Sequence, residues 1–307
     1  ILLCGIASFK FLNVWMDLPH HSPKSETVID VDMHATYDMR YSRSIIPVFT
    51  ILLLAIILLS TDNNRGDVLK IGVISDPEGF YQNVDDIMKR FREENVDIVL
   101  VAGDLCDHFR NKIPDEEEID AVLHTLSGYN MPVYLIPGNH ETVDVYHPVF
   151  ERYRGSNLVD LSAGNPVDLQ GVNIYPLPGY HLKDFTAEGG FNYDLHDITR
   201  LMEKHVDDGD RGILLSHGPP NYTGSLHPDT IFSGENAGDS NIRHLIHNLN
   251  ISLAVFGHIH EAGGLAATIV DGRVERAYPG RCYNLSLIHI SEPTRPLYIS
   301  YAVFCLK

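Results

Sequence analysis

Five apolar runs of this chain are each followed by side chains of the types that can bind metal ions. This arrangement constrains the fold more than any other feature. The runs begin at residues 68, 96, 131, 212 and 251, and they read VLKIGVIS, VDIVLVAG, MPVYLIPG, GILLSHG and ISLAVFGHIH. Their aliphatic and β-branched content is typical of buried strands. Functional sites of open α/β sheets gather in the loops beyond the carboxyl ends of strands, so we expect the side chains after these runs to meet.

The segments between the runs have the spacing of helices that pack on a sheet. Apolar residues recur at i, i+3, i+4 and i+7 in two of them, at Val84, Ile87, Met88 and Phe91 and at Ile119, Val122, Leu123 and Leu126. HDITRLMEKHV and NIRHLIHNL are further expected helices, while NIYPLPG and two runs joined at Asp271-Gly272 are expected strands. The alternation predicts a layered α/β domain with a central sheet.

The polar residues at the run ends form one chemical set. Oxygen ligands mixed with imidazoles suit a pair of divalent ions of the manganese, iron or zinc type. In chain order the residues are Asp76, Glu78, Asp104, Asp107, Asn139, His140, His217, His258 and His260.

Five blocks in this order and spacing resemble the signature of the calcineurin-like metallophosphoesterases: SDPEG, GDLCD, GNHE, SHG and GHIH. The resemblance covers roughly residues 69–284, and we place the domain at 67–284. It implies an α/β fold of the αββα two-sheet sandwich type, here preceded by an apolar N-terminal helix. It also implies a dinuclear metal site at the strand ends.

The resemblance assigns roles by position. Asp76 and His260 would hold the first metal with help from Glu78, and Asp104 would bridge both ions. The second metal would be held by Asn139, His217 and His258, while His140 matches the catalytic histidine and Asp107 the carboxylate that orients it.

The expected chemistry is hydrolysis of phosphate ester bonds. Two cations about 3.5–4 Å apart share a water, lower its pKa and present a bridging hydroxide to the phosphorus. His140 would donate a proton to the leaving oxygen or stabilise charge on the phosphoryl group. Two alternatives are a non-catalytic metal-binding scaffold of the same fold and a nuclease. The net charge of −18 makes nucleic acid an unfavourable partner.

One residue departs from the family pattern, because most members have D-x-H in the first block and this chain has Asp76-Pro77-Glu78. A ligating Glu78 adds negative charge, which favours Mn²⁺ or Mg²⁺ over Zn²⁺ and repels a dianionic monoester more than a diester. We therefore expect manganese dependence and a preference for phosphodiesters. The alternative is that Glu78 faces solvent.

Both ends of the chain look foreign to this domain. Residues 1–38 show no sustained period and are interpreted as a leader outside the fold, with Met39 as the native start. Residues 285–307 resemble translated sequencing-adapter DNA and are interpreted as a non-native tail.

Residues 39–66 are expected to be a signal anchor or a cleaved signal peptide with a linker. The run 45–60 is uncharged and apolar on every side, which disfavours a buried core helix. Arg40 and Arg43 precede it, so the positive-inside rule places the domain outside the cytoplasm, membrane-anchored or secreted. A small-molecule or lipid-linked phosphoester is then the expected substrate, and the sequence indicates no oligomeric state.

Two loops are expected to set specificity, at residues 180–195 and 219–239. Their aromatic residues stack on a substrate or pack in the core: Tyr180, Phe185, Phe191, Tyr193 and Tyr222.

Overall fold

The computed structural model describes the phosphoesterase-like region and little outside it. The described residues are 13–16, 29–32, 69–110, 113–169, 171–203, 211–222, 227–249, 251–263, 265–270, 273–275, 282–284 and 301–306. The expected apolar helix at 45–60 and most of residues 1–38 therefore lie outside them. Within these ranges, no helix has both the length and the apolar character needed to cross a membrane.

Two seven-stranded sheets form the centre of the molecule. The first has the order β2-β1-β14-β3-β4-β5-β6. Its strands are β1 (Asn13–Met16), β2 (Ile29–Asp32), β3 (Leu69–Ile74), β4 (Ile98–Ala102), β5 (Val133–Ile136), β6 (Leu158–Asp160) and β14 (Tyr301–Leu306). Strands β3 to β6 run parallel, as strand–helix alternation requires.

The second sheet has the order β12-β11-β13-β10-β9-β8-β7. Its strands are β7 (Val167–Leu169), β8 (Val172–Leu177), β9 (Arg211–Ser216), β10 (Ile251–Phe256), β11 (Ala266–Val270), β12 (Arg273–Glu275) and β13 (Cys282–Asn284). Strands β8, β9, β10 and β13 are parallel, and β11 and β12 form the hairpin expected around Asp271-Gly272.

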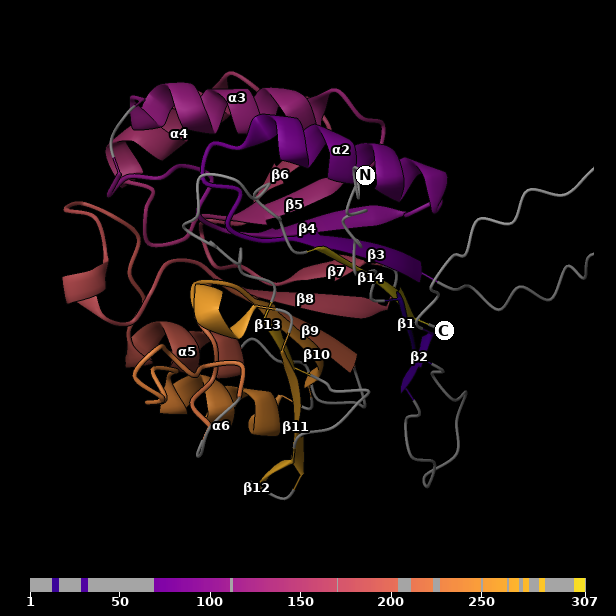
Figure 1. Ribbon diagram of the computed structural model, residues 1–307, viewed down its shortest axis with the longest axis vertical. Coiled ribbons are helices and arrows are strands. Elements are labelled where there is room, and N and C mark those ends of the chain that lie inside the picture. Colours follow the sequence, from indigo (N-terminus) through magenta and orange to yellow (C-terminus); the bar gives the residue numbers. More distant parts are fainter. Residues whose placement is uncertain are drawn as a thin grey trace, which may run out of the picture.

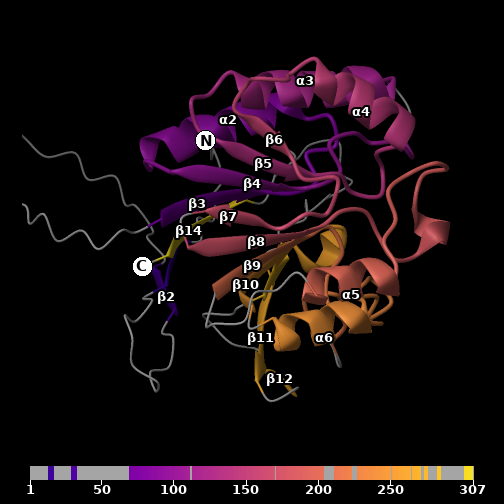
Figure 2. The ribbon, with the colours of Figure 1, turned by 180° about the vertical axis from the view of Figure 1, so that it is seen from behind.

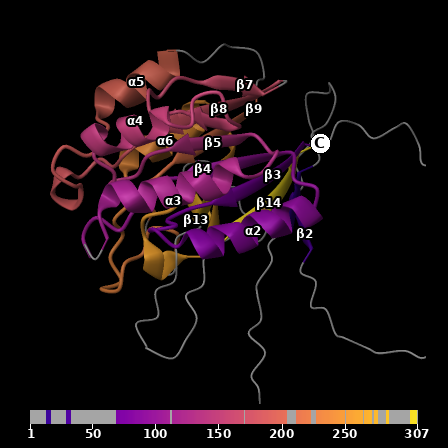
Figure 3. The same cartoon turned by 90° about the horizontal axis from the view of Figure 1, so that it is seen from above.

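Helices cover the outer face of each sheet, as Figure 1 shows from the front and Figure 2 from behind. The first sheet carries α2 (Tyr81–Glu93), α3 (Asp115–Ser127) and α4 (Val143–Glu151), which lie across it in Figure 3. The second carries α5 (Leu195–Glu203) and α6 (Ser240–Asn248). The result is the αββα sandwich that the sequence predicts.

Apolar side chains fill each interface between the layers. Ile71, Val73 and Leu100 of the first sheet pack with Ile213, Leu253 and other residues of the second in one buried cluster. The helical stripes predicted from the sequence face the first sheet: the buried residues of α2 are Val84, Ile87, Met88 and Phe91. Burial of such side chains from both faces explains why β4 is buried at every position.

The C-terminal segment takes part in the first sheet. Strand β14 pairs antiparallel with β3 from Tyr301 against Ile74 to Leu306 against Leu69. The sequence predicts that residues 1–38 lie outside the fold, whereas Asn13–Met16 and Ile29–Asp32 form β1 and β2 of the first sheet. It likewise predicts that residues 285–307 are a non-native tail, whereas the structure uses Tyr301–Leu306 of that segment as a strand. The foreign origin of the segment stays a prediction.

Candidate metal centre

All the predicted site residues lie at one edge of the sandwich, where the parallel strands end. Asp76 follows β3 and Asp104 follows β4, each two residues beyond the strand, and Asn139 lies three residues beyond β5. On the second sheet, His217 directly follows β9 and His258 lies two residues beyond β10. The topology therefore brings together residues that are far apart in the sequence.

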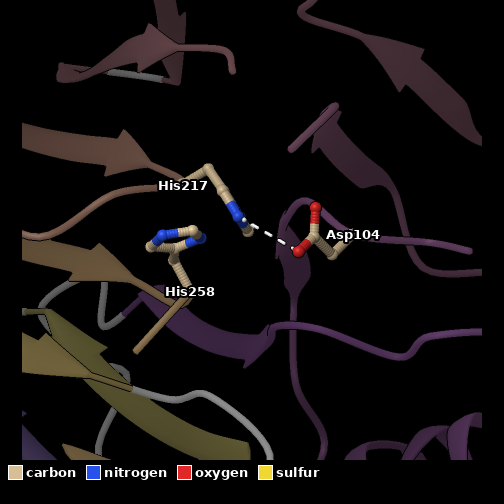
Figure 4. A group of neighbouring side chains, drawn as sticks. All are labelled: Asp104, His217 and His258. Atoms are coloured by element: carbon tan, nitrogen blue, oxygen red, sulfur yellow. Dashed lines mark ion pairs between the residues drawn. The ribbon is translucent and has the colours of Figure 1, made fainter. Parts of the chain in front are cut away.

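The first group of ligands joins the two sheets. Asp104, His217 and His258 each offer a ligand atom, and these atoms lie within 4.8 Å of one another (Figure 4). Nε2 of His217 is 3.2 Å from Oδ2 of Asp104. Oδ1 of Asn139 lies 2.6 Å from Nε2 of His217 and 2.8 Å from Nδ1 of His258.

Hydrogen bonding at His217 shows that this group suits a cation. Nδ1 of His217 is 2.8 Å from the carbonyl oxygen of Ala102, which can only accept, so Nδ1 carries the hydrogen. The Nδ2 of Asn139 donates to the carbonyl oxygen of Phe185 at 2.7 Å, which turns its Oδ1 toward the imidazoles. Nε2 therefore faces two oxygen acceptors, so that either a proton, as the raised pKa of His217 indicates for the metal-free site, or a cation must lie between them. A divalent ion between these atoms would satisfy all of them, so the donor set fits the expected metal.

The second group contains the departure from the family pattern. Nε2 of His260 lies 3.4 Å from Oε1 of Glu78 and 3.7 Å from Oδ1 of Asp76. Glu78 is only 3% exposed, so it does not face solvent. Glu78 therefore lies beside His260 through Oε1, while its Oε2 is 3.7 Å from Nη1 of Arg110.

His140 and Asp107 lie beside the second group, and their polar atoms pair with other residues. Nδ1 of His140 is 3.0 Å from the carbonyl oxygen of Cys106, and Nε2 is 3.5 Å from Oδ2 of Asp104. Oδ2 of Asp107 is 3.4 Å from Nε of Arg110. Ligand atoms of Glu78, Asp107 and His140 still lie within 4.8 Å of one another. The Cys106 carbonyl is thus the group that orients the His140 ring in this structure.

The backbone of the site adopts a conformation that is rare for residues with side chains. Among the non-glycine residues that the structure describes, positive φ angles occur at Asp76 (51°), Glu78 (43°), Asn95 (55°), Asp104 (55°) and His258 (68°). Such residues cost about 1 kcal/mol or more each and cluster at functional sites. Four of the five belong to the predicted metal site.

Hydrogen bonds hold these strained turns. The amide of Asp76 donates to Gly103 O at 3.1 Å, and that of Glu78 donates to Asp104 O at 2.9 Å. Across the sheets, the amide of His258 donates to Oδ1 of Asp76 at 3.0 Å. The ligand loops therefore brace one another directly.

Buried charges set the protonation of the ligands. Burial alone would raise the pKa of Asp104, but the imidazoles of His140 and His217 lower it well below its usual range. Burial lowers the pKa of His217, but the Asp104 carboxylate outweighs it and raises the value to about 9. Burial, together with the charge on His217, lowers the pKa of His258 to about 3. The site thus favours an ionised Asp104 with positive charge beside it.

The calcineurin-like phosphoesterase family model matches residues 69–262. The chain belongs to this family. The match spans most of the described domain and includes all five sequence blocks. This membership makes the protein a metal-dependent phosphoester hydrolase.

Two solved structures share the calcineurin-like phosphoesterase fold. A dimetal phosphatase from Danio rerio is 13% identical, with a TM-score of 0.52, over 76% of this chain and 91% of that one. TT1561 of Thermus thermophilus is 17% identical, with a TM-score of 0.51, over 68% of this chain and 88% of that one. At these identities the likeness concerns the fold.

In this calcineurin-like phosphoesterase, Glu141 is a site residue that sequence reasoning missed. Its buried carboxylate accepts the amides of Gly138 at 2.6 Å and of Asp104 and Cys106 at 3.2 Å, and it also accepts that of Leu105. Burial and the charge of Asp104 raise the pKa of Glu141 to about 7. The only signal in the sequence was its place as the last residue of the GNHE block.

Most of the aromatic residues expected near a substrate pack inside this phosphoesterase. Tyr180, Tyr193 and Tyr222 are each at most 4% exposed. The ring of Phe191 packs against those of Tyr146 and His147. Phe185 alone among the five is exposed, at 59%.

Proposed function

We propose that this phosphoesterase cleaves phosphate esters at a pair of divalent ions held by Asp76, Glu78, Asp104, Asn139, His217, His258 and His260. The observation that carries the proposal is the convergence of these side chains from five strand ends at one edge of the sandwich. Two bound ions would polarise the phosphoryl group and activate the attacking water. The remaining steps fall to side chains of the protein.

His140 is proposed to supply the proton that the leaving oxygen requires. Its Nδ1 faces the Cys106 carbonyl, so that nitrogen carries a hydrogen in either charge state. Only Nε2 is then available to exchange a proton, and it lies on the side of Asp104. Burial lowers the pKa of His140, but the charges of Asp104, Glu141 and Glu78 outweigh it, so that the pKa is raised overall. A raised pKa keeps the imidazolium available as a general acid.

The side chain of His140 is only 13% exposed, so its ring would help to exclude water from a bound substrate. Asn139 contributes a neutral oxygen, so it ligates without adding negative charge. Asp107 is proposed to act on the charge around His140 rather than by direct contact, since its carboxylate lies against Arg110.

Diester preference and manganese dependence are the finer parts of the proposal. Glu78 adds a third carboxylate to those of Asp76 and Asp104. Two divalent ions together with these three carboxylates would give the site a net charge of about +1. This weakly positive site repels a dianionic monoester more than a monoanionic diester. Hard oxygen donors at the first ion favour Mn²⁺ over Zn²⁺.

Steady-state hydrolysis by the full chain tests these statements. We expect turnover of bis(4-nitrophenyl) phosphate with Mn²⁺ to exceed that of 4-nitrophenyl phosphate, and His140→Ala to lower kcat by about 10²–10⁴-fold. His147→Ala is the matched control, because His147 is 45% exposed and is not one of the predicted site residues. An unchanged kcat in His140→Ala would contradict the role of His140 as the general acid. A clear preference of the wild type for the monoester would contradict the diester preference.

We also propose attachment to a membrane through residues 45–60, with the domain outside the cytoplasm and a small-molecule or lipid-linked substrate. The support is the apolar run itself, with Arg40 and Arg43 before it. Carbonate extraction of membranes from cells that express the full chain tests this attachment. Recovery in the soluble fraction would contradict an anchor.

A further inference from the structure

The loop that follows β4 places a phenylalanine against the proposed general acid. The Phe109 ring meets the His140 imidazole edge-on, with 4.8 Å between the ring centroids and planes at 86°. Phe109 nevertheless stays 56% exposed. An aromatic ring that touches a catalytic side chain and faces solvent is positioned to meet a ligand.

The same loop is fixed at two points by the first turn of α3. The amide of Asp107 donates to Oε2 of Glu118 at 2.7 Å, and Nδ1 of His108 lies 2.6 Å from Oδ2 of Asp115. Two carboxylates of the acidic first turn of α3, those of Asp115 and Glu118, thus hold this loop. The position of Phe109 is thus set by the scaffold, independently of any bound molecule.

A second exposed phenylalanine is anchored to the neighbouring site residue. The carbonyl oxygen of Phe185 accepts the Asn139 amide at 2.7 Å, and the side chain of Phe185 is 59% exposed. Its short helix η1 (Lys183–Phe185) stands out from the sandwich at the left of Figure 1. Phe185 thus contacts Asn139 through its backbone, whereas Phe109 contacts His140 through its ring.

We infer that Phe109 is a specificity-determining residue that contacts the leaving group of the substrate, and that this leaving group is apolar. The inference rests on the proposed function of His140. A group that receives a proton from His140 must lie beside that ring, and Phe109 is the exposed apolar surface that the ring touches. Contact with an aromatic ring removes apolar area of both partners from water.

Three esters with a common phosphoryl group test the inference in the Mn²⁺-loaded full chain: 2-naphthyl, phenyl and glyceryl. We expect Phe109→Ala to raise KM for the 2-naphthyl ester about three- to tenfold, with a smaller rise for phenyl. The glyceryl ester should change less than about twofold, because a polar group gains little from the ring. Phe109→Leu keeps an apolar contact and should lie between the wild type and Phe109→Ala.

Tyr81→Ala is the matched control, since Tyr81 is an exposed aromatic residue of α2, at 44%, and lies outside the two loops expected to set specificity. It should leave all three esters unchanged. An equal loss of kcat for all three esters in Phe109→Ala would overturn the inference, because it would mean that the ring only positions His140. No effect on any ester would overturn it as well.

Binding of a non-hydrolysable 2-naphthyl phosphonate, measured by calorimetry, separates this inference from the proposed function. A Kd that is three- to tenfold higher in Phe109→Ala than in the wild type supports apolar recognition, even if no ester is turned over. The absence of turnover would contradict only the catalytic proposal. Equal Kd values in wild type and Phe109→Ala would overturn the inference while leaving hydrolysis intact.

Discussion

Glu141 links the two loops that carry Asp104 and Asn139. Glu141→Gln removes the charge and one of the two acceptor oxygens, so some of the amides of residues 104–106 and 138 lose their partner in a buried place. We expect the free energy of unfolding to fall by about 1–3 kcal/mol. Urea unfolding of the metal-free protein measures this, with exposed Glu188→Gln as control. Equal stability of the two variants would show that Glu141 does not brace the loops.

Gly138 is required because of its neighbour across the site. A Cβ at this position would overlap Oδ1 of Asp104 and approach its amide nitrogen to 2.6 Å. Gly138→Ala should therefore displace Asp104 and weaken Mn²⁺ binding at least about tenfold, as loss of a well-placed ligand does. Calorimetric titration with Mn²⁺ checks it. Gly128→Ala is the control, because its Cβ would meet nothing closer than 3.4 Å, and wild-type affinity in Gly138→Ala would disprove the steric argument.

Helix α2 is held against the first sheet by the apolar side of its surface. Phe91 is fully buried, and its ring occupies the space above Gly72, where a Cβ would come within 2.6 Å of it. Phe91→Ala should destabilise the protein by about 3–5 kcal/mol, since the cavity cannot collapse onto a glycine. Denaturant unfolding measures the loss. Tyr81→Ala in the same helix, where the residue is 44% exposed, should cost far less.

Helices and strands with regular apolar spacing could be predicted from the sequence, whereas α4 could not. The buried residues of α3 are those that its spacing indicates, Ile119, Val122, Leu123 and Leu126. Helix α4 is nine residues long, contains Pro148 and is rich in β-branched residues, all of which local propensity disfavours. The helix is stabilised by a tertiary effect, because its Tyr146 and Phe150 are buried in the core between the first sheet and its helices.

The ligands could be predicted for a similar reason, because strand ends in a parallel sheet fix where side chains meet. Glu141 and Phe109 could not, since their importance depends on contacts that no local pattern encodes. Three of the four backbone amides that donate to Glu141 belong to residues 35 or more positions earlier. The orientation of His140 toward the Cys106 carbonyl, in place of Asp107, likewise depends on side-chain torsions.

For the whole molecule, the metal centre should act as a cross-link between the sheets. Asp76, Asp104 and Asn139 follow strands of the first sheet, whereas His217 and His258 follow strands of the second. Ions that bind only the folded protein stabilise it by about 2.7 kcal/mol at a hundredfold excess over Kd, or about 5–10 °C in Tm. Differential scanning fluorimetry with Mn²⁺ and with a chelator measures this shift. The shift should vanish in His217→Ala and persist in His147→Ala, and a shift retained in both would place the ion elsewhere.

The left-handed turns at Asp76, Glu78, Asp104 and His258 are held by backbone amides that donate to carbonyl oxygens or to the carboxylates of Asp76 and Glu141. Since these hydrogen bonds require no ion, we expect the ligand loops to keep their positions when one divalent cation replaces another. Which cation the enzyme carries in the cell then depends on the affinity of oxygen and nitrogen donors and on the supply of each ion in the compartment.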